Sequence, residues 1–217
     1  MAKYPILLEL AGRRVVLIGG GAVAARKAQP LFAAGARLIV IAEEIDPVLE
    51  AICRRTNAKI IRGKYRKEYL AGALIAIAAT NNNELNRQIH KDCQQLEVLC
   101  NVVDDPECCD FFIPAVVSRG SIQIAVSTNG QCPAYAGHLR KKLERTLTAQ
   151  HGEFLSELTE LRKQAISELD NPAERKAVLG QFVDDSSFDY FVEHGPERWR
   201  EYARKVISEH QSKTIPG

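Results

Sequence analysis

Short apolar runs alternate with amphipathic segments over the first hundred residues, and this alternation constrains the fold more than any other feature. The apolar runs, rich in Val, Ile, Leu and Ala, lie at 14–19, 37–42, 59–63, 73–80 and 97–102. Helical patterns lie between most of them, at 22–35, 46–55 and 83–95. Strands that are apolar along their whole length are typical of a parallel sheet covered by helices on both faces. We therefore expect an α/β fold with an N-terminal parallel sheet.

Three glycines follow the first apolar run and precede the first helical pattern, in the sequence IGGGAVAARK. Read as G-x-G-x-x-A, this segment places Gly19 at a tight turn and Gly21 where the backbone approaches a pyrophosphate. Ala24 then allows close packing of helix on strand. The pyrophosphate would lie on the free N–H groups of Ala22 and Val23, where the helix begins. Strand, loop, helix and second strand together favour a dinucleotide-binding Rossmann domain over an ordinary turn.

Two later segments follow predicted strands and hold further candidates for cofactor contacts. Glu43 or Glu44 would accept the ribose hydroxyls of the dinucleotide, although both residues also fit a solvated loop. Two carboxylates without an adjacent arginine disfavour a 2′-phosphate, so NAD is preferred over NADP. Thr80 and Asn81 either contact the cofactor or cap the helix predicted at 83–95.

Composition and charge argue against several classes of protein. The net charge is only +2, and the modest basic excess of residues 1–150 suits a small anionic ligand but not nucleic acid. Six cysteines without a C-x-x-C pair indicate reduced thiols, with no resident metal site. The N-terminus does not resemble a signal peptide, and no apolar run approaches the roughly 20 residues of a membrane span. We expect a cytoplasmic protein without a membrane or nucleic-acid partner.

The pattern changes after residue 110. Two β runs within 110–128 meet at Arg119-Gly120, which predicts a hairpin or a pair of crossing strands. From Pro133 onward the periodicity predicts helices alone. Asn171-Pro172 and Gly195-Pro196 are expected to divide the tail into three helices.

Three segments, at 4–42, 76–86 and 100–144, closely resemble the siroheme synthase family, and within it the precorrin-2 dehydrogenase and sirohydrochlorin ferrochelatase module. The resemblance is carried by the glycine loop, N-V-V-D at 101–104, F-x-x-P at 111–114 and I-A-x-S-T-x-G-x-x-P at 124–133. It implies three parts: an NAD-binding Rossmann domain at 1–112, a central α/β dimerisation segment at 113–149 and a small helical C-terminal domain at 150–217. A homodimer is therefore expected. The family's additional methyltransferase domain has no counterpart here, so we expect a stand-alone module that depends on a separate methyltransferase.

The family resemblance implies NAD-dependent oxidation of precorrin-2 to sirohydrochlorin, with insertion of Fe(II) as a substrate in many members. Both steps need a base, and Asp104 matches the aspartate of N-V-V-D. Asp105 is a lesser candidate. The alternative for both aspartates is a turn before Pro106, in which their side chains form local hydrogen bonds. A non-catalytic NAD-sensing module is a further alternative, although it would need neither N-V-V-D nor the basic residues that follow.

Precorrin-2 carries eight carboxylates, and the segment 113–145 holds five basic residues against one acid. By the resemblance, Arg119 and Arg140 are the best placed to bind those carboxylates, whereas the other three fit a solvated helix face. Ser127 and Thr128 lie in the loop before that helix and are further candidates. Gly137 stands where relatives commonly have an arginine, and His138 beside it would compensate, act as an acid, contact incoming iron, or simply lie on the helix surface.

Overall fold

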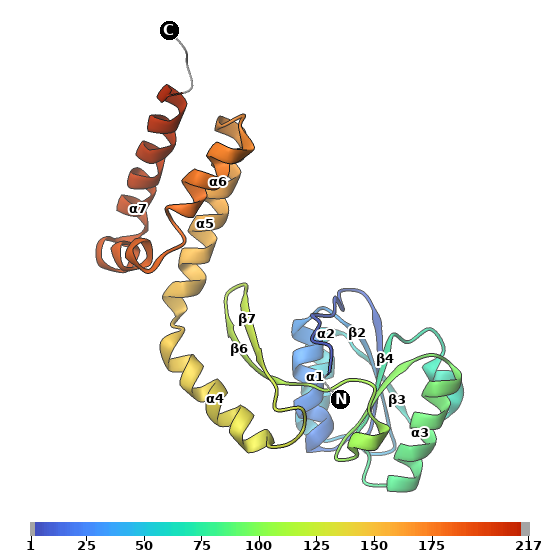
Figure 1. Ribbon diagram of the computed structural model, residues 1–217. Helices are drawn as coiled ribbons and strands as arrows, with labels where there is room; N and C mark the ends of the chain where they lie inside the picture. The colour runs from blue at the N-terminus through green and yellow to red at the C-terminus, as the bar shows by residue number, and fades with distance from the viewer. Residues whose placement is uncertain (1–2, 214–217) are drawn as a thin grey trace. The chain divides into compact units, whose positions relative to one another are not determined.

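The computed structural model describes residues 3–213. The chain divides between Ile113 and Pro114 into two compact units, named Met1–Ile113 and Pro114–Gly217 (Figure 1). Two clusters of buried apolar side chains lie in the first unit, and a third lies in the second. Each unit therefore has a hydrophobic core of its own. The division into three parts at residues 112 and 149 stays a prediction.

The first unit contains the expected parallel sheet. Its strands are β1 (Arg14–Ile18), β2 (Arg37–Ala42), β3 (Lys59–Arg62), β4 (Ile75–Ala78) and β5 (Leu99–Val102). They lie in the order β3-β2-β1-β4-β5, and every neighbouring pair is parallel. The chain moves outward from β1 through β2 to β3 and then crosses to β4 on the other side of β1. Open α/β sheets bind their ligands at such a reversal, at the carboxyl ends of the strands.

Helices cover both faces of the sheet because alternate strand residues belong to different cores. On one face, α1 (Ala22–Ala33) and α2 (Pro47–Thr56) pack on Val15, Leu17, Leu38 and Val40. On the other, α3 (Asn83–Gln95) and the short 3-10 helix η1 (Lys67–Leu70) pack on Val16, Ile18, Ile39 and Ile41. These clusters explain why the strands read as continuous apolar runs.

Four strands end at one level of the sheet. Ile18 of β1 pairs with Ile41 of β2 and with Ala78 of β4, and Ala78 pairs with Val102 of β5. The loops that follow these strands therefore leave the sheet along a single edge. Neighbouring strands are about 4.8 Å apart, so the ends of β1 and β5 are separated by about 10 Å.

The second unit begins with an antiparallel hairpin of β6 (Ala115–Arg119) and β7 (Ile122–Val126), so the two predicted β runs pair instead of crossing. Arg119 pairs with Ile122, which makes Gly120 and Ser121 the turn and places Arg119 within the strand. The hairpin packs on α4 (Pro133–Thr146) and on α5 (Ala149–Glu168). The predicted junction at Arg119-Gly120 is thus shifted by one residue.

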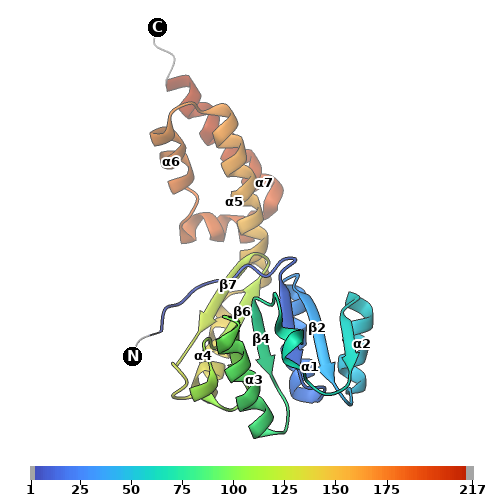
Figure 2. The same cartoon turned by 90° about the vertical axis from the view of Figure 1, so that its right-hand side faces the viewer.

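The rest of the second unit is helical (Figure 2), with α6 (Pro172–Gly180) and α7 (Asp185–Lys213) beside α5. Trp199 and Phe182 lie in their shared core, where Trp199 donates a hydrogen bond to Ser187 Oγ at 3.0 Å. The two predicted breaks are found at Pro172, where α6 begins, and at Gly195, where a φ of 82° kinks α7. The further break between α6 and α7 was not predicted. Within residues 3–213, no helix combines the length and the apolar character that a bilayer span requires.

Candidate functional site

The glycine loop turns sharply because two of its residues touch neighbouring backbone. Gly19 has a φ of 122°, and a Cβ there would lie 2.2 Å from the carbonyl oxygen of Ala79. A Cβ on Gly20 would lie 1.9 Å from the carbonyl oxygen of Glu44. The fingerprint treats Gly20 as a variable position, so sequence reasoning missed this requirement. The run of three glycines was the signal that it was needed.

Gly21 differs from its two neighbours because the protein leaves the space beside it open. A Cβ on Gly21 would meet no atom within 4 Å among the described residues. Gly21 is also the N-cap residue of α1, whose first turn contains no acid and begins with Ala22 and Val23. The N–H groups of a first helical turn have no carbonyl partner within the helix and favour a negative charge. This combination fits the pyrophosphate of a dinucleotide.

The loop after β2 lies against the glycine loop. The Asp46 N–H donates to the carbonyl oxygen of Gly20 at 2.7 Å, and the Asp46 side chain caps α2 by accepting from the Val48 N–H at 2.8 Å. Glu43 and Glu44 directly follow the strand, and both are exposed. They lie where an acceptor for ribose hydroxyls is expected, and that role stays a prediction.

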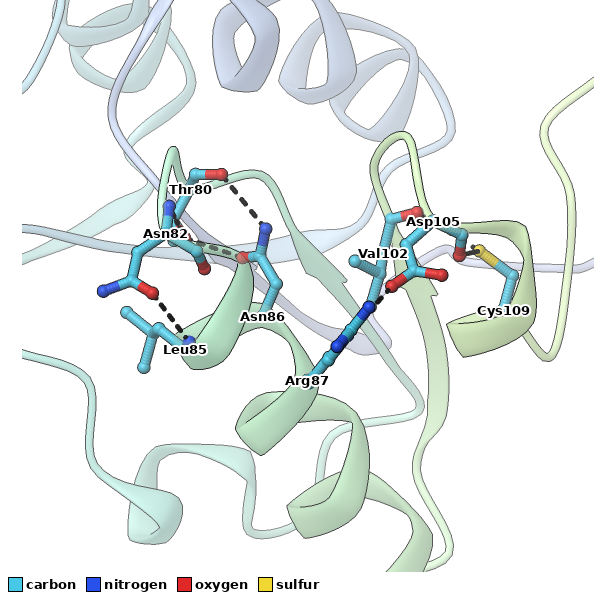
Figure 3. A network of polar contacts seen from close by, with 8 residues as sticks. All are labelled: Thr80, Asn82, Leu85, Asn86, Arg87, Val102, Asp105 and Cys109. Atoms are coloured by element: carbon cyan, nitrogen blue, oxygen red, sulfur yellow. Dashed lines mark hydrogen bonds and ion pairs between the residues drawn. The ribbon is translucent and has the colours of Figure 1, made fainter.

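A buried asparagine holds the loop after β4 (Figure 3). The Thr80 hydroxyl donates to Asn86 Oδ1 at 2.7 Å, and Asn86 Nδ2 donates to the Thr80 carbonyl oxygen at 3.0 Å. The cap of α3 is Asn82, whose Oδ1 accepts from the Leu85 N–H at 3.0 Å. Neither Thr80 nor Asn81 is therefore the capping residue. Asn81 is exposed at this edge, and its contact with the cofactor stays a prediction.

The loop after β5 presents Asp104 on the same edge of the sheet. Asp104 is exposed and has a φ of 63°, in the left-handed region that few residues other than glycine adopt. Its carboxylate forms no hydrogen bond or ion pair with any residue that the structure describes. A turn does precede Pro106, but the Asp104 side chain does not stabilise it by local hydrogen bonding.

The neighbouring residues Asp105 and Cys109 hold this turn (Figure 3). The Cys109 thiol donates to the carbonyl oxygens of Val102 and Asp105, at 3.2 and 3.3 Å. Desolvation raises the pKa of the Cys108 thiol, and the Asp105 charge raises it further. The Cys108 thiol is therefore protonated at neutral pH and is not a ready nucleophile.

The second unit holds the predicted substrate-binding residues, and its two arginines contact their own unit. Arg119 Nε donates to the Leu147 carbonyl oxygen at 2.7 Å, and Nη2 donates to that of Glu144 at 3.1 Å. These carbonyls lie at the C-terminal end of α4, where helical carbonyl groups lack partners. Arg140 forms an ion pair with Glu144 one turn along the same helix. Both arginines thus have structural contacts, and their binding of substrate stays a prediction.

The loop before α4 contains the two predicted hydroxyl residues. Ser127 Oγ accepts from the Asn129 N–H at 3.1 Å, and Thr128 Oγ1 accepts from the Cys132 N–H at 3.2 Å. Accepting these bonds leaves each hydroxyl hydrogen able to bind a further acceptor. His138 is exposed on α4 and stacks with Tyr135, with ring centroids 6.1 Å apart. Neither observation tests the predicted contacts with substrate.

Two family models match the chain. Residues 6–115, just over half of the sequence, match the model described as "Putative NAD(P)-binding", and residues 119–146 match "Sirohaem biosynthesis protein central". The fold is similar to a solved structure titled "SirC, precorrin-2 dehydrogenase", with a TM-score of 0.81 and 23% identity. That alignment covers 94% of this chain and 100% of the other and shows a shared fold.

Curated relatives named siroheme synthase are similar in sequence but longer. The protein of Psychrobacter arcticus is 38% identical over 75% of this chain and 30% of its own length, and that of Chromobacterium violaceum is 39% identical over 71% and 33%. The chain thus spans about a third of the length of these relatives. The chain belongs to the NAD(P)-binding family of the first model and carries the central segment of the sirohaem biosynthesis proteins, as its resemblance predicted.

Proposed function

We propose that the chain is an NAD-dependent dehydrogenase that oxidises precorrin-2 to sirohydrochlorin. The relatives named siroheme synthase and the fold shared with a precorrin-2 dehydrogenase support this activity. The observation that carries the proposal is Asp104, an unengaged carboxylate on the edge of the sheet where the glycine loop also opens. A non-catalytic NAD sensor would have no use for such a group there.

The residues on this edge fit NAD as the cofactor. Gly21, Ala22 and Val23 would hold the pyrophosphate at the start of α1, while Glu43 or Glu44 would accept the ribose hydroxyls. A 2′-phosphate would meet two carboxylates in that position, which favours NAD over NADP. Thr80 and Asn81 would line the cofactor from the end of β4.

Asp104 would collect the proton that the substrate loses. Bound NAD⁺ supplies the acceptor for a hydride, so the oxidation of precorrin-2 releases one proton for each hydride transferred. The Asp104 carboxylate is exposed on this edge, and removal of a proton by a positioned carboxylate is general base catalysis. The Cys109 thiol stabilises the turn in which Asp104 has its left-handed backbone, so the backbone position of Asp104 is held.

Several finer features belong to the same proposal. Arg119, Arg140, Ser127, Thr128 and His138 would contact the tetrapyrrole carboxylates. Insertion of Fe(II), as a substrate, would use Asp104 to accept the protons displaced from the pyrrole nitrogens, and the name siroheme synthase of the relatives supports this second step. A homodimer would form through the central segment, and the protein would act in the cytoplasm.

An anaerobic absorbance assay tests the proposal. Protein, NAD⁺ and precorrin-2 are expected to give the spectrum of sirohydrochlorin, and later addition of Fe(II) reports siroheme. Replacing Asp104 by asparagine is expected to lower turnover about 100-fold or more while the affinity for NAD⁺ stays unchanged. Glu107→Gln removes one exposed negative charge from the same turn and serves as the control. A flat trace with intact NAD⁺ binding would favour the sensor, and normal turnover of Asp104→Asn would remove this residue from the mechanism.

A further inference from the structure

The segment after β5 is strongly acidic, although the proposed substrate is a polyanion. Asp104, Asp105, Glu107 and Asp110 fall within seven residues. Asp110 accepts from the Cys100 N–H at 2.8 Å and from Gln94, so its charge is partly compensated. Like charges repel across a site, and a substrate with eight carboxylates would be kept away from Asp104 unless a cation lies close by.

Arg87 brings a positive charge next to Asp105 of this acidic segment (Figure 3). Its Nε lies 3.6 Å from Asp105 Oδ2, and its side chain is 70% exposed, against 27% for Asp105. This distance is longer than that of a hydrogen bond. The Arg87 guanidinium has no other ion pair among residues 3–213. Such an exposed pair contributes little to stability, so stability alone gives no reason for an arginine here.

The backbone beneath Arg87 is well held. Its neighbour Asn86 is only 3% exposed and is fixed by hydrogen bonds in both directions with Thr80. Arg87 therefore stands on α3 between the loops that follow β4 and β5, with its contact to Asp105 orienting the guanidinium (Figure 3). The terminal nitrogens remain for a ligand, and a guanidinium binds a carboxylate with two parallel hydrogen bonds.

We propose that Arg87 binds a carboxylate of the substrate beside Asp104, and that Asp105 positions Arg87 for this contact. This inference rests on the proposed function, because it takes a polycarboxylate as the substrate. Asp105, the second aspartate of N-V-V-D-D, thereby orients a cation instead of acting as a second base. Arg87 would also offset the negative charge of the turn, so that a polyanion can approach this edge of the sheet.

Kinetics of the chain with precorrin-2 and NAD⁺ test the role of Arg87. Arg87→Gln is expected to raise the KM for precorrin-2 about tenfold, with kcat within about twofold of wild type and the affinity for NAD⁺ unchanged. Arg87→Lys keeps the positive charge but lacks the two parallel N–H donors of a guanidinium. It should therefore recover only part of the loss. Asp105→Asn leaves the cation in place but loosens it, and the loss of one repulsive charge offsets part of that effect, so a smaller rise in KM is expected. A fall in kcat equal to the fall in kcat/KM would overturn the assignment to binding.

A matched control and a binding measurement separate this inference from the proposed function. Arg54 of α2 has a side chain that is 76% exposed and pairs with Glu50 at 3.1 Å. Arg54→Gln therefore also removes one exposed cation and its ion pair, but from another part of the surface. Binding of uroporphyrin, a stable porphyrin with eight carboxylates, is followed by fluorescence quenching. Weaker binding by Arg87→Gln than by Arg54→Gln supports the inference even in a protein that fails to oxidise precorrin-2. Equal binding by the two variants and wild type would overturn it.

Discussion

The predicted functional residues have different surroundings in the two units of the molecule. In Met1–Ile113, the predicted cofactor residues lie on one edge of the sheet, where Gly21 and Asp104 face open space. In Pro114–Gly217, the predicted substrate-binding arginines, Arg119 and Arg140, are engaged by carbonyl groups and by Glu144. A backbone requirement is local and can be recognised in sequence. The role of a charged surface residue is harder to recognise in sequence, because its partner can be another group of the same protein instead of a ligand.

Substitutions of adjacent glycines give the largest expected effect and test the first half of this comparison. Gly20→Ala places a methyl group 1.9 Å from the Glu44 carbonyl oxygen, so backbone has to move. We expect a loss of about 3 kcal/mol in the free energy of unfolding, at the upper end for overpacking. Thermal unfolding without cofactor measures this loss.

Gly21→Ala is the matched partner of that variant. The new methyl group meets no described atom within 4 Å, so the stability of the protein without cofactor should remain close to wild type. Its affinity for NAD⁺ should nevertheless fall at least tenfold, because the methyl group occupies the approach of the pyrophosphate. Comparable destabilisation by the two alanines, or an unchanged affinity for NAD⁺ in Gly21→Ala, would contradict the distinction between a structural and a ligand-facing glycine.

Removal of Arg119 tests the second half of the comparison. Arg119→Ala deletes the donors to Leu147 and Glu144 and leaves the end of α4 uncapped, for which we expect about 2 kcal/mol of destabilisation. Arg119→Lys should recover part of this stability and not the whole. Denaturant unfolding gives the stability, and the KM for precorrin-2 gives the substrate contact. A raised KM without a change in stability would restore Arg119 to the substrate site and weaken the contrast between the units.

The fold of the first unit was accessible from sequence because apolar runs, a glycine loop and the helical periodicity of 46–55 are local signals. The strands do pair in parallel, and α2 forms over Pro47–Thr56. Other features depend on contacts between distant segments. Gly20 is required by the approach of Glu44, and Arg87 meets Asp105 from another element, so neither was expected from spacing. The break between α6 and α7 was missed because residues 181–184 contain no proline, although α6 ends at Gly180.

Asn86→Ala tests whether side chains as well as backbone hold the cofactor edge. The change removes both hydrogen bonds with Thr80 from a position that is 3% exposed, and we expect about 1.5 kcal/mol of destabilisation. The affinity for NAD⁺ should fall only severalfold, because the glycine loop stays intact. Asn83→Ala, at an exposed position at the start of α3, is the control for the same truncation. Equal stability of the two variants would show that Asn86 does not hold the loop.

The smallest expected change in stability comes from the Arg140–Glu144 pair, and it separates the two roles of a charged residue. Each side chain is 31% exposed and the pair spans one helical turn, so Arg140→Gln and Glu144→Gln should each cost about 0.4 kcal/mol. Their effects on substrate should differ in sign. If Arg140 binds a substrate carboxylate, Arg140→Gln raises the KM for precorrin-2, whereas Glu144→Gln releases Arg140 and removes a repulsive charge, which lowers the KM. Equal KM values for both variants and wild type would show that the pair only stabilises α4, as the contacts of Arg119 do at the end of the same helix.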